Sequence, residues 1–567
     1  MNKPEMREKC KEYAKDLLPL LSDYVGKWAR ERGEKLALIE YDTGEKVTWK
    51  KFEQAMDAFG AKLLSMGLKK GDVVATSLPL LKEHVFLEYA CFKTGIIIAP
   101  LDLRLKATEV KDAFEKVKPK AYFFLGKTPR ADFRPIVEEV KKSAPYCKYW
   151  VQFQPEAEGI IEGAQYIKEF AKDIKWKFIF SKITGSVKKA NRKVEKRDPA
   201  LIIFTTGSTG SPKPAMICHE NILLQNIGLA VGFGVDPGEI MLVNLPPSHV
   251  GCQTEQLMTP IYAGETSVIM HIFDAEKTLD AIQKHKITIF GQIPALFAMQ
   301  WRLPNYDDYD LSSLRFAIYG GQAVDKPFLE KLKTMAPLMG SGLGLTETAG
   351  FCTYTPTDWK VDEIVDSIGF DSPLCPISIR EPMKSDGSSG AEKPAGEIGE
   401  ICFSGPQVFL GYMNDEVNTK KTVSTDGYCY TGDIGFYNDT GLHFAGRSKF
   451  VIKPKGYQVF PAEVENFITD NFKEQVVRTG CVGVKHEVFT EAIVACVELK
   501  KGASLTREEL DAKMKEVAAY KRPSHYIFID EGEMPLNRVA KVDVLELKKK
   551  ADSEIDGLRK QGKWDKS

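Results

Sequence analysis

Short apolar runs, each long enough for one buried strand, alternate with amphipathic stretches along most of the chain. Buried strands that alternate with helices are typical of a parallel sheet covered by helices. The pattern therefore predicts a layered α/β fold with substantial parallel sheet. The apolar runs lie at residues 35–41, 96–101, 121–125, 200–205, 267–273, 287–290 and 316–319, and helical patterns lie at 49–66, 107–117 and 278–285.

The chain has 567 residues, which is too long for one ordinary domain. After about residue 395, short turn-bounded strands at 396–405 and 441–446 indicate a β-rich subdomain. A compact α/β unit then follows, with helices expected at 461–470 and 506–518 and strands near 476–484 and 492–498. We therefore expect a large N-terminal domain over residues 1–446 and a small, mobile C-terminal α/β domain over 447–567, with a hinge near Lys449.

Composition excludes several classes of protein. The 78 basic and 78 acidic side chains cancel, so nothing global indicates nucleic acid or an anionic membrane as partner. A basic cluster at residues 188–197 is interpreted as a solvated linker. The eleven cysteines form no CxxC pair, which argues against a zinc site or a disulfide framework and favours a cytoplasmic location. No apolar run is long enough to predict a membrane span.

One segment carries the groups that a polyphosphate needs. Residues 200–213 begin as a buried strand and break into a loop in which Gly207 and Gly210 let backbone N–H groups turn toward one point. Lys213 adds a cation, and no Gly-Lys-Ser/Thr sequence closes the loop as in a Walker A motif. A polar turn between strand and helix is the alternative. The hydroxyl donors are Thr205, Thr206, Ser208 and Thr209.

This loop resembles the phosphate loop of the adenylate-forming superfamily, which includes acyl-CoA synthetases, peptide-synthetase adenylation domains and beetle luciferases. The resemblance spans roughly residues 35–545. Three residues depart from the family's pattern: Pro214 and Ala540 stand where glycine is usual, and Leu343 stands where tyrosine is usual. The other matching segments follow in the family's order at residues 245–251, 318–323, 341–347, 430–433, 446–449, 452–465 and 535–541.

The resemblance implies a role for each matching residue. Thr346 would bond the α-phosphate, Glu347 would hold Mg²⁺ together with Thr206, and Lys541 would be the adenylation lysine. Asp433 would accept both ribose hydroxyls, and Arg447 would also reach the ribose. The remaining implied contacts are Gly321, Gln322, Leu343 and Gly344 around adenine, Lys449 at the hinge, and Lys455, Gly456 and Tyr457 along the pantetheine path.

The acid-binding pocket is expected to be apolar. By the resemblance, His249 would form a wall of this pocket rather than act as a base. Amino-acid-activating relatives place an aspartate here, whereas this chain has no acid before Glu255. An uncharged, mainly hydrocarbon acyl group is therefore predicted. The pocket candidates are His249, Val250, Gly251, Ile293, Ala295, Gly320 and Gly344.

The resemblance implies an AMP-forming carboxylate:CoA ligase that uses ATP, Mg²⁺ and CoA. A carboxylate is a poor electrophile, and its attack on the α-phosphorus of ATP converts one of its oxygens into part of a good leaving group, AMP. The alternatives are an acyl-AMP ligase that loads a carrier protein, a luciferase-like oxygenase, and a binding protein without catalysis. The expected partners are a small carboxylic acid, ATP and CoA, and the chain is expected to be a monomer or a homodimer.

Overall fold

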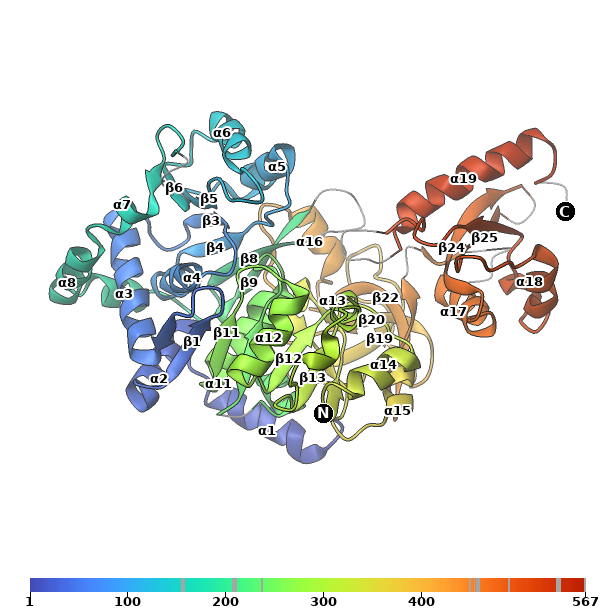
Figure 1. Ribbon diagram of the computed structural model, residues 1–567, viewed down its shortest axis with the longest axis horizontal. Helices are drawn as coiled ribbons and strands as arrows, with labels where there is room; N and C mark the ends of the chain where they lie inside the picture. The colour runs from blue at the N-terminus through green and yellow to red at the C-terminus, as the bar shows by residue number, and fades with distance from the viewer. Residues whose placement is uncertain are drawn as a thin grey trace. The chain divides into compact units, whose positions relative to one another are not determined.

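The computed structural model covers residues 1–567 and describes all of them except 154–158, 206–211, 236–237, 448–449, 453, 455–458, 488–489, 537–541 and 565–567. The chain divides into two compact units (Figure 1). The first contains residues 1–377, 383–389 and 402–429, and the second contains residues 378–382, 390–401 and 430–567. The domain boundary predicted between residues 446 and 447 stays a prediction.

Two large sheets build the first unit, and most of their strand pairs are parallel, the exceptions being β1 with β2, β8 with β9 and β9 with β21. The α/β fold expected from the sequence is thereby confirmed. The first sheet has the order β14 (Leu338–Gly340), β13 (Phe316–Tyr319), β12 (Ile289–Gln292), β10 (Ile240–Val243), β11 (Thr266–Ile269), β1 (Leu36–Glu40), β2 (Lys46–Thr48). The second has the order β21 (Gly411–Tyr412), β9 (Lys213–Cys218), β8 (Pro199–Thr205), β4 (Ile97–Pro100), β3 (Val73–Ser77), β5 (Ala121–Leu125), β6 (Tyr149–Phe153), β7 (Gln165–Tyr166).

Helices cover these sheets and bury a large apolar core. Two short antiparallel strand pairs, β15 (Gly344–Leu345) with β16 (Gly350–Phe351) and β17 (Thr353–Tyr354) with β18 (Phe370–Asp371), follow the first sheet. The helices are α1 (Pro4–Lys15), α2 (Leu21–Arg32), α3 (Trp49–Ser65), α4 (Lys82–Thr94), α5 (Ala107–Val117), α6 (Arg134–Ser143), α7 (Ile167–Ala171), α8 (Ile174–Thr184), α9 (Ser186–Asn191), α10 (His219–Phe233), α11 (Met258–Ala263), α12 (Ala275–His285), α13 (Pro294–Trp301), α14 (Lys326–Lys333), α15 (Val361–Asp366) and α16 (Glu416–Thr422), with a π-helix at Gly251–Leu257 and 3₁₀ turns at Tyr306–Asp308 and Thr346–Thr348.

The second unit holds most of a four-stranded sheet and a smaller α/β part. The four-stranded sheet has the order β19 (Ile377–Arg380), β20 (Gly399–Phe403), β22 (Cys429–Asn438), β23 (Gly441–Arg447). The smaller part contains the sheet β24 (Val476–His486), β25 (Thr490–Leu499), β26 (His525–Ile529) and helices α17 (Pro461–Asn471), α18 (Arg507–Met514) and α19 (Val544–Lys560), with a 3₁₀ turn at Ala519–Lys521.

Two sequence-based expectations need correction. The helix expected to reach residue 518 ends at Met514, because Arg522 donates hydrogen bonds to the carbonyls of Lys515 and Val517 and so stabilises a turn there. The linker expected from residue 188 onward is wrong for its first residues, which form the end of α9 behind buried Val187. In the part of the chain that the structure describes, no helix is long and apolar enough to cross a bilayer.

Helix α4 buries a carboxyl group against the π-helix. The Glu88 Oε1 atom accepts a hydrogen bond from Gln253 Nε2 at 2.6 Å and lies 3.4 Å from His84 Nε2. His84 Nδ1 donates to the Pro79 carbonyl, which leaves Nε2 as the acceptor for Thr76. Burial raises the pKa of Glu88 to about 8 and lowers the pKa of His84 to about 4, so both groups are neutral at pH 7. The hydrogen bond between Gln253 and Glu88, which ties the π-helix to α4, therefore joins two uncharged side chains.

The raised pKa of Glu88 predicts a pH-dependent loss of stability. The folded chain keeps a proton on Glu88 that the unfolded chain releases above about pH 4.3, so the free energy of unfolding falls as pH rises toward 8. Between pH 5 and 8, wild type should lose about 1 kcal/mol per pH unit more than Glu88→Gln does. Urea unfolding at a series of pH values measures this difference. Glu508→Gln, on the exposed first turn of α18, should follow wild type, and parallel curves for wild type and Glu88→Gln would contradict the assignment.

Candidate active site

The predicted phosphate loop joins two antiparallel strands. Strands β8 and β9 pair so that Thr205 lies opposite Lys213 where the loop begins and ends. Lys116 of α5 donates from Nζ to the carbonyl of Pro212 at 2.7 Å, which holds the residue directly before β9. The loop connects strand to strand, which differs from the alternative of a turn between strand and helix. The loop residues Thr206, Gly207, Ser208, Thr209 and Gly210 lie outside the described residues.

Pro214 lies in strand β9, where it does not interrupt the pairing with β8. The carbonyls of Pro214 and Met216 accept hydrogen bonds from Met413 and Leu410, on the β21 side of the strand. The N–H and C=O of one strand residue point the same way, so the N–H that proline lacks would also face β21. The departure from glycine at this position therefore leaves the β8–β9 hairpin intact.

Tyr412 connects the phosphate-loop lysine to the predicted metal ligand. Its ring centroid lies 5.1 Å from Lys213 Nζ, and its hydroxyl donates to Glu347 Oε1 at 2.5 Å. Burial and the nearby Glu347 charge raise the pKa of Tyr412, so the hydroxyl stays protonated. The sequence analysis missed Tyr412, because a tyrosine that follows an apolar run beside Gly411 is typical of ordinary core.

The turn that carries Thr346 and Glu347 depends on close contact between backbones. A Cβ atom at Gly342 would lie 1.8 Å from the Thr353 carbonyl oxygen, and one at Gly344 would lie 2.7 Å from the carbonyl carbon of Gly350. Only glycine fits either position. The Leu343 N–H donates to Thr353 Oγ1 at 2.8 Å, so the turn does not depend on which side chain stands at 343. Thr346 and Glu347 open the 3₁₀ turn, and the Phe409 N–H donates to the Glu347 carbonyl.

Two of the predicted pocket residues, Ile293 and Gly320, directly follow the carboxyl ends of strands in the first sheet. Strands β10, β12, β13 and β14 are parallel, and ligands of open α/β sheets bind where such strands end. A Cβ atom at Gly320 would lie 3.1 Å from Cζ of Phe351, and one at Gly321 would lie 3.4 Å from Cγ2 of Ile293. Phe351 also pairs with Gly344, so its ring lies among the predicted residues although the sequence analysis did not single it out. Gln322 follows Gly321 after β13, and Ala295 lies in the first turn of α13.

His249 begins the segment that leads into the π-helix. Its Nε2 atom lies 3.8 Å from Asp102 Oδ2, and the N–H groups of Cys252 and Gln253 donate to its carbonyl. Burial lowers the pKa of His249, while the Asp102 charge acts in the opposite direction. A neutral imidazole suits the wall of an apolar pocket. Val250 and Gly251, both half-buried, follow His249 at the start of the π-helix, a geometry that is frequent at functional sites.

An acid lies closer to the pocket residues than the sequence indicated. Glu255 accepts a hydrogen bond from the Phe351 N–H, and a Cβ atom at Gly350 would lie 2.8 Å from Glu255 Oε1. Burial raises the pKa of Glu255 to about 7, so near neutral pH much of it is uncharged. The π-helix bends the chain so that position 255 faces the β15–β16 hairpin, which spacing alone did not reveal.

The second unit contains the residues that the resemblance assigned to ribose. Asp433 on β22 is 3% exposed and lies opposite Arg447 on β23, of which only the backbone is described. The Gly432 N–H donates to Glu400 Oε1, and the Asp433 N–H donates to Thr431 Oγ1 at 3.0 Å. Gly432 has a φ of 74°, which favours glycine. These contacts fix the backbone that presents the Asp433 carboxylate.

Several predicted site residues lie outside the described residues, and their roles stay predictions. Residues on either side of two of these segments form backbone bridges. Leu536 bridges Val542 across the segment that contains Lys541, and Ile452 bridges Val459 across the segment that contains Lys455, Gly456 and Tyr457. The residues concerned are Lys449, Lys455, Gly456, Tyr457 and Lys541.

The donor set at Glu347 fits Mg²⁺ bound together with a nucleotide. Magnesium in nucleotide sites is usually held by one or two carboxylates plus phosphate oxygens and waters. Tyr412 holds one oxygen of the half-buried Glu347 carboxylate, which leaves Oε2 for a cation. The described residues contain no cluster of three or more His, Cys, Asp or Glu side chains that would form a cage of their own.

Comparison with known proteins agrees with this arrangement. The sequence model of the AMP-binding enzyme family matches residues 25–413, and that of the AMP-binding enzyme C-terminal domain matches residues 463–541. The chain is 28% identical over 544 residues to 4-coumarate–CoA ligase CCL1 of Humulus lupulus, covering 94% of this chain and 93% of that protein. It is 27% identical to the mitochondrial medium-chain acyl-CoA ligase ACSF2 of Danio rerio, covering 92% and 86%.

Solved structures share the fold. The anthranilate CoA ligase AuaEII in complex with anthranoyl-AMP superposes with a TM-score of 0.77 at 20% identity, covering 96% of this chain and 99% of that one. ATP-bound MatB from Rhodopseudomonas palustris gives a TM-score of 0.74 at 22% identity, covering 94% and 99%. The chain has the large N-terminal and smaller C-terminal domain of these enzymes. It belongs to the AMP-binding enzyme family and is an AMP-forming acid–thiol ligase that uses ATP, CoA and Mg²⁺.

Proposed function

We propose that this enzyme activates an apolar carboxylic acid, of the medium-chain, alicyclic or aromatic kind, and transfers the acyl group reversibly to CoA. The observation that carries the proposal is the carboxyl end of the first sheet, where Gly320 lies against the Phe351 ring, Gly321 lies against Ile293, and Gly344 pairs with the Phe351 backbone. Glycine, isoleucine and phenylalanine carry no charge that could pair with an ionic group on the acid. The names of the relatives, a 4-coumarate–CoA ligase and a medium-chain acyl-CoA ligase, are in keeping with such acids.

In the first half-reaction a carboxylate oxygen forms a bond to the α-phosphorus of ATP, and the bond to pyrophosphate breaks. Two anions must be brought together, so positioning and fixed positive charge supply most of the catalysis. Lys213 and the hydroxyls of the phosphate loop would hold the departing phosphates, Thr346 would bond the α-phosphate, and Lys541 would stabilise charge on the reacting centre. Glu347, with Thr206, would hold Mg²⁺, which neutralises phosphate charge when bound.

In the second half-reaction the CoA thiolate forms a bond to the acyl carbon, and the bond from that carbon to the AMP oxygen breaks. Lys455, Gly456 and Tyr457 would line the path of the thiol after rotation about a hinge near Lys449, with domains over residues 1–446 and 447–567. Asp433 and Arg447 would hold the ribose, while Gly321, Gln322 and Leu343 would contact adenine. A cytoplasmic location, and a monomeric or homodimeric state, stay predictions.

Tyr412→Phe should impair acyl-AMP formation and raise the Mg²⁺ requirement. The substitution keeps the ring beside Lys213 but removes the donor that orients Glu347. A hydrogen bond to a charged group contributes about 1.5–3 kcal/mol, so the rate at low Mg²⁺ should fall about 10-fold or more. Acid-dependent exchange of pyrophosphate into ATP, titrated with Mg²⁺, measures both effects.

Tyr122→Phe is the matched control for this prediction. Its buried hydroxyl donates to Ser77 Oγ at 2.7 Å, between β5 and β3, and has no part in the proposed site. This variant should keep the Mg²⁺ titration of wild type. Equal shifts in the two variants would show that Tyr412 acts only through general stability.

Lys541→Ala should separate the two half-reactions. Loss of one preorganised charge donor should slow acyl-AMP formation about 10²-fold, whereas attack of CoA on supplied acyl-AMP should be largely spared. Rapid-quench assays of each half-reaction measure the split. Lys549→Ala, which removes an exposed lysine of α19, should affect neither step. Equal loss in both half-reactions would rule out the assigned role.

A screen of pyrophosphate release tests the choice of acid. Medium-chain, alicyclic and aromatic carboxylic acids should each be tried with and without CoA, beside amino acids. Release is expected with members of the first group, and thioester is expected only when CoA is present. Efficient turnover of amino acids with none for the hydrocarbon acids would overturn the proposed substrate class while leaving the ligase chemistry in place.

A further inference from the structure

Helix α8 carries large apolar side chains on the face that looks away from the protein. Trp176 is 74% exposed, Phe180 64%, Ile183 79% and Ile179 47%. At about 100° per residue these four positions fall within an arc of about 100° on one side of the helix. The opposite side is the packed one: Ile174 contacts the main core, and Ser181 is buried. A helix that is apolar on both faces has one face without a partner.

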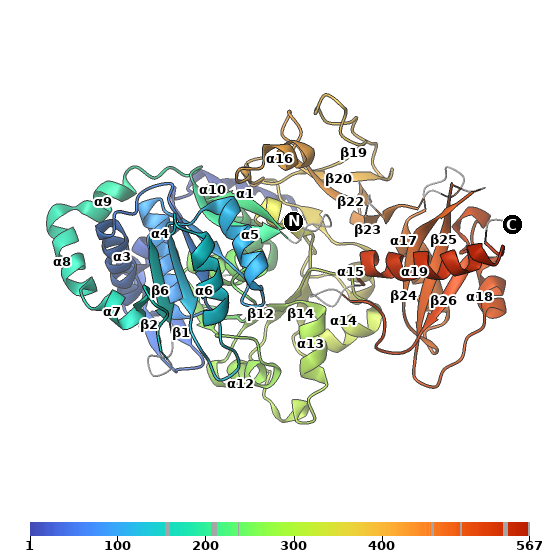
Figure 2. The same cartoon turned by 90° about the horizontal axis from the view of Figure 1, so that it is seen from above.

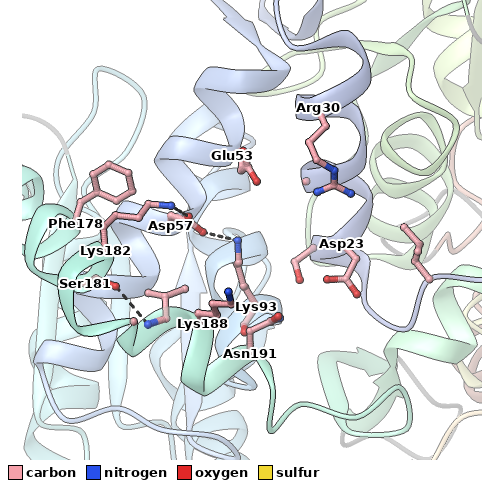
Figure 3. Close-up of a pocket in the computed structure, with 15 residues that line it drawn as sticks. Asp23, Arg30, Glu53, Asp57, Lys93, Phe178, Ser181, Lys182, Lys188 and Asn191 are labelled. Carbon is pink, nitrogen blue, oxygen red and sulfur yellow. Dashed lines mark hydrogen bonds and ion pairs between the residues drawn. The ribbon is translucent and has the colours of Figure 1, made fainter.

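Ion pairs fix which face points outward. Lys182 Nζ lies 2.7 Å from Asp57 Oδ2, and Lys62 Nζ lies 2.5 Å from Asp173 Oδ1, so both ends of α8 are tied to α3. Lys93 Nζ also lies 2.5 Å from Asp57 Oδ1. Figure 3 shows Lys182 and Lys93 converging on Asp57 at the wall of a cavity of about 470 Å³, beside Phe178 and Ser181. Rolling α8 to bury its outer face would break these pairs.

The surroundings of the outer face are strongly basic. Residues 172–193 contain eight Lys and Arg side chains and one acid, Asp173, in a chain whose total charge is zero. Asp173 already pairs with Lys62. Within the described chain, the exposed cations Lys175, Lys189 and Arg192 form no ion pair with a carboxylate, whereas Lys188 lines the cavity on the inner side. The neutral total therefore conceals a local patch of positive charge.

We propose that α8 and α9 dock this protein reversibly on the surface of an anionic lipid bilayer. Tryptophan and phenylalanine on one face, with lysines along the rim, are typical of helices that lie in the membrane interface. Trp176, Phe180 and Ile183 would enter the boundary between headgroups and acyl chains, and the lysines would contact lipid phosphates. Both views place α8 at the outer edge of the first unit, beyond α3 (Figure 1, Figure 2).

A second copy of the chain fits this face less well. A two-fold contact would bring the same patch of both copies together. The unpaired cations of the two copies would then repel each other across an apolar contact, where charge is poorly screened. Anionic headgroups instead offer the opposite sign. The proposal is independent of which acid the enzyme activates, because the docking face lies apart from the proposed acid-binding residues.

Sedimentation of the full chain with vesicles tests the proposal, without any substrate present. Binding is expected to vesicles of equal parts phosphatidylglycerol and phosphatidylcholine, to be at least about 10-fold weaker with phosphatidylcholine alone, and to weaken as salt is raised. Phe180→Ser with Ile183→Ser should reduce binding at least about 10-fold. Both residues are exposed, so circular dichroism and pyrophosphate exchange should stay as in wild type.

The matched control is Val417→Ser on α16, where valine is 65% exposed. This variant should bind vesicles as wild type does. Three results would each overturn the proposal: no binding to the anionic vesicles, equal binding by the double variant, or a wild-type dimer in solution that the double variant abolishes. The last result would make the outer face of α8 a protein interface.

Discussion

The hydrogen bond from Tyr412 to Glu347 connects two parts of the first unit that belong to different sheets. Tyr412 lies on β21 and pairs with β9, so it is fixed to the hairpin that carries the phosphate loop. Glu347 lies in the turn that follows the first sheet, and the Phe409 N–H holds its carbonyl. Lys213 lies over the ring of Tyr412 and Glu347 accepts from its hydroxyl, so one buried tyrosine contacts both a cation and a carboxylate. Phosphate and Mg²⁺ need these two charges at a fixed separation.

Two buried carboxyl groups hold the π-helix against its neighbours. Glu88 holds the π-helix through Gln253, and Glu255 on the same helix receives the Phe351 N–H. Burial raises the pKa of both carboxyl groups, to about 8 for Glu88 and about 7 for Glu255, so near neutral pH Glu88 is mostly protonated and Glu255 partly so. The π-helix thereby joins the segment that follows His249 to the hairpin with Gly344.

Much of the fold could be predicted because its signals are local. Helix α5 occupies the predicted residues 107–117, where apolar side chains recur at helical spacing. The glycines at 342 and 344 mark a turn that no other residue fits. Tyr412 could not be found this way, since it is 65 residues from Glu347 in sequence and only the fold brings them together. Helix α8 was not predicted from the sequence, and periodicity alone does not show which apolar face of a helix packs against a partner.

The central claim is that a carboxylate oxygen of the substrate attacks the α-phosphorus of ATP. An acid labelled with ¹⁸O in both carboxylate oxygens tests this most directly, because the attacking oxygen stays with AMP when the thioester forms. Mass spectrometry of the AMP produced should find one ¹⁸O atom per molecule. Unlabelled AMP, with the label in inorganic phosphate or pyrophosphate instead, would contradict adenylation as the route of activation.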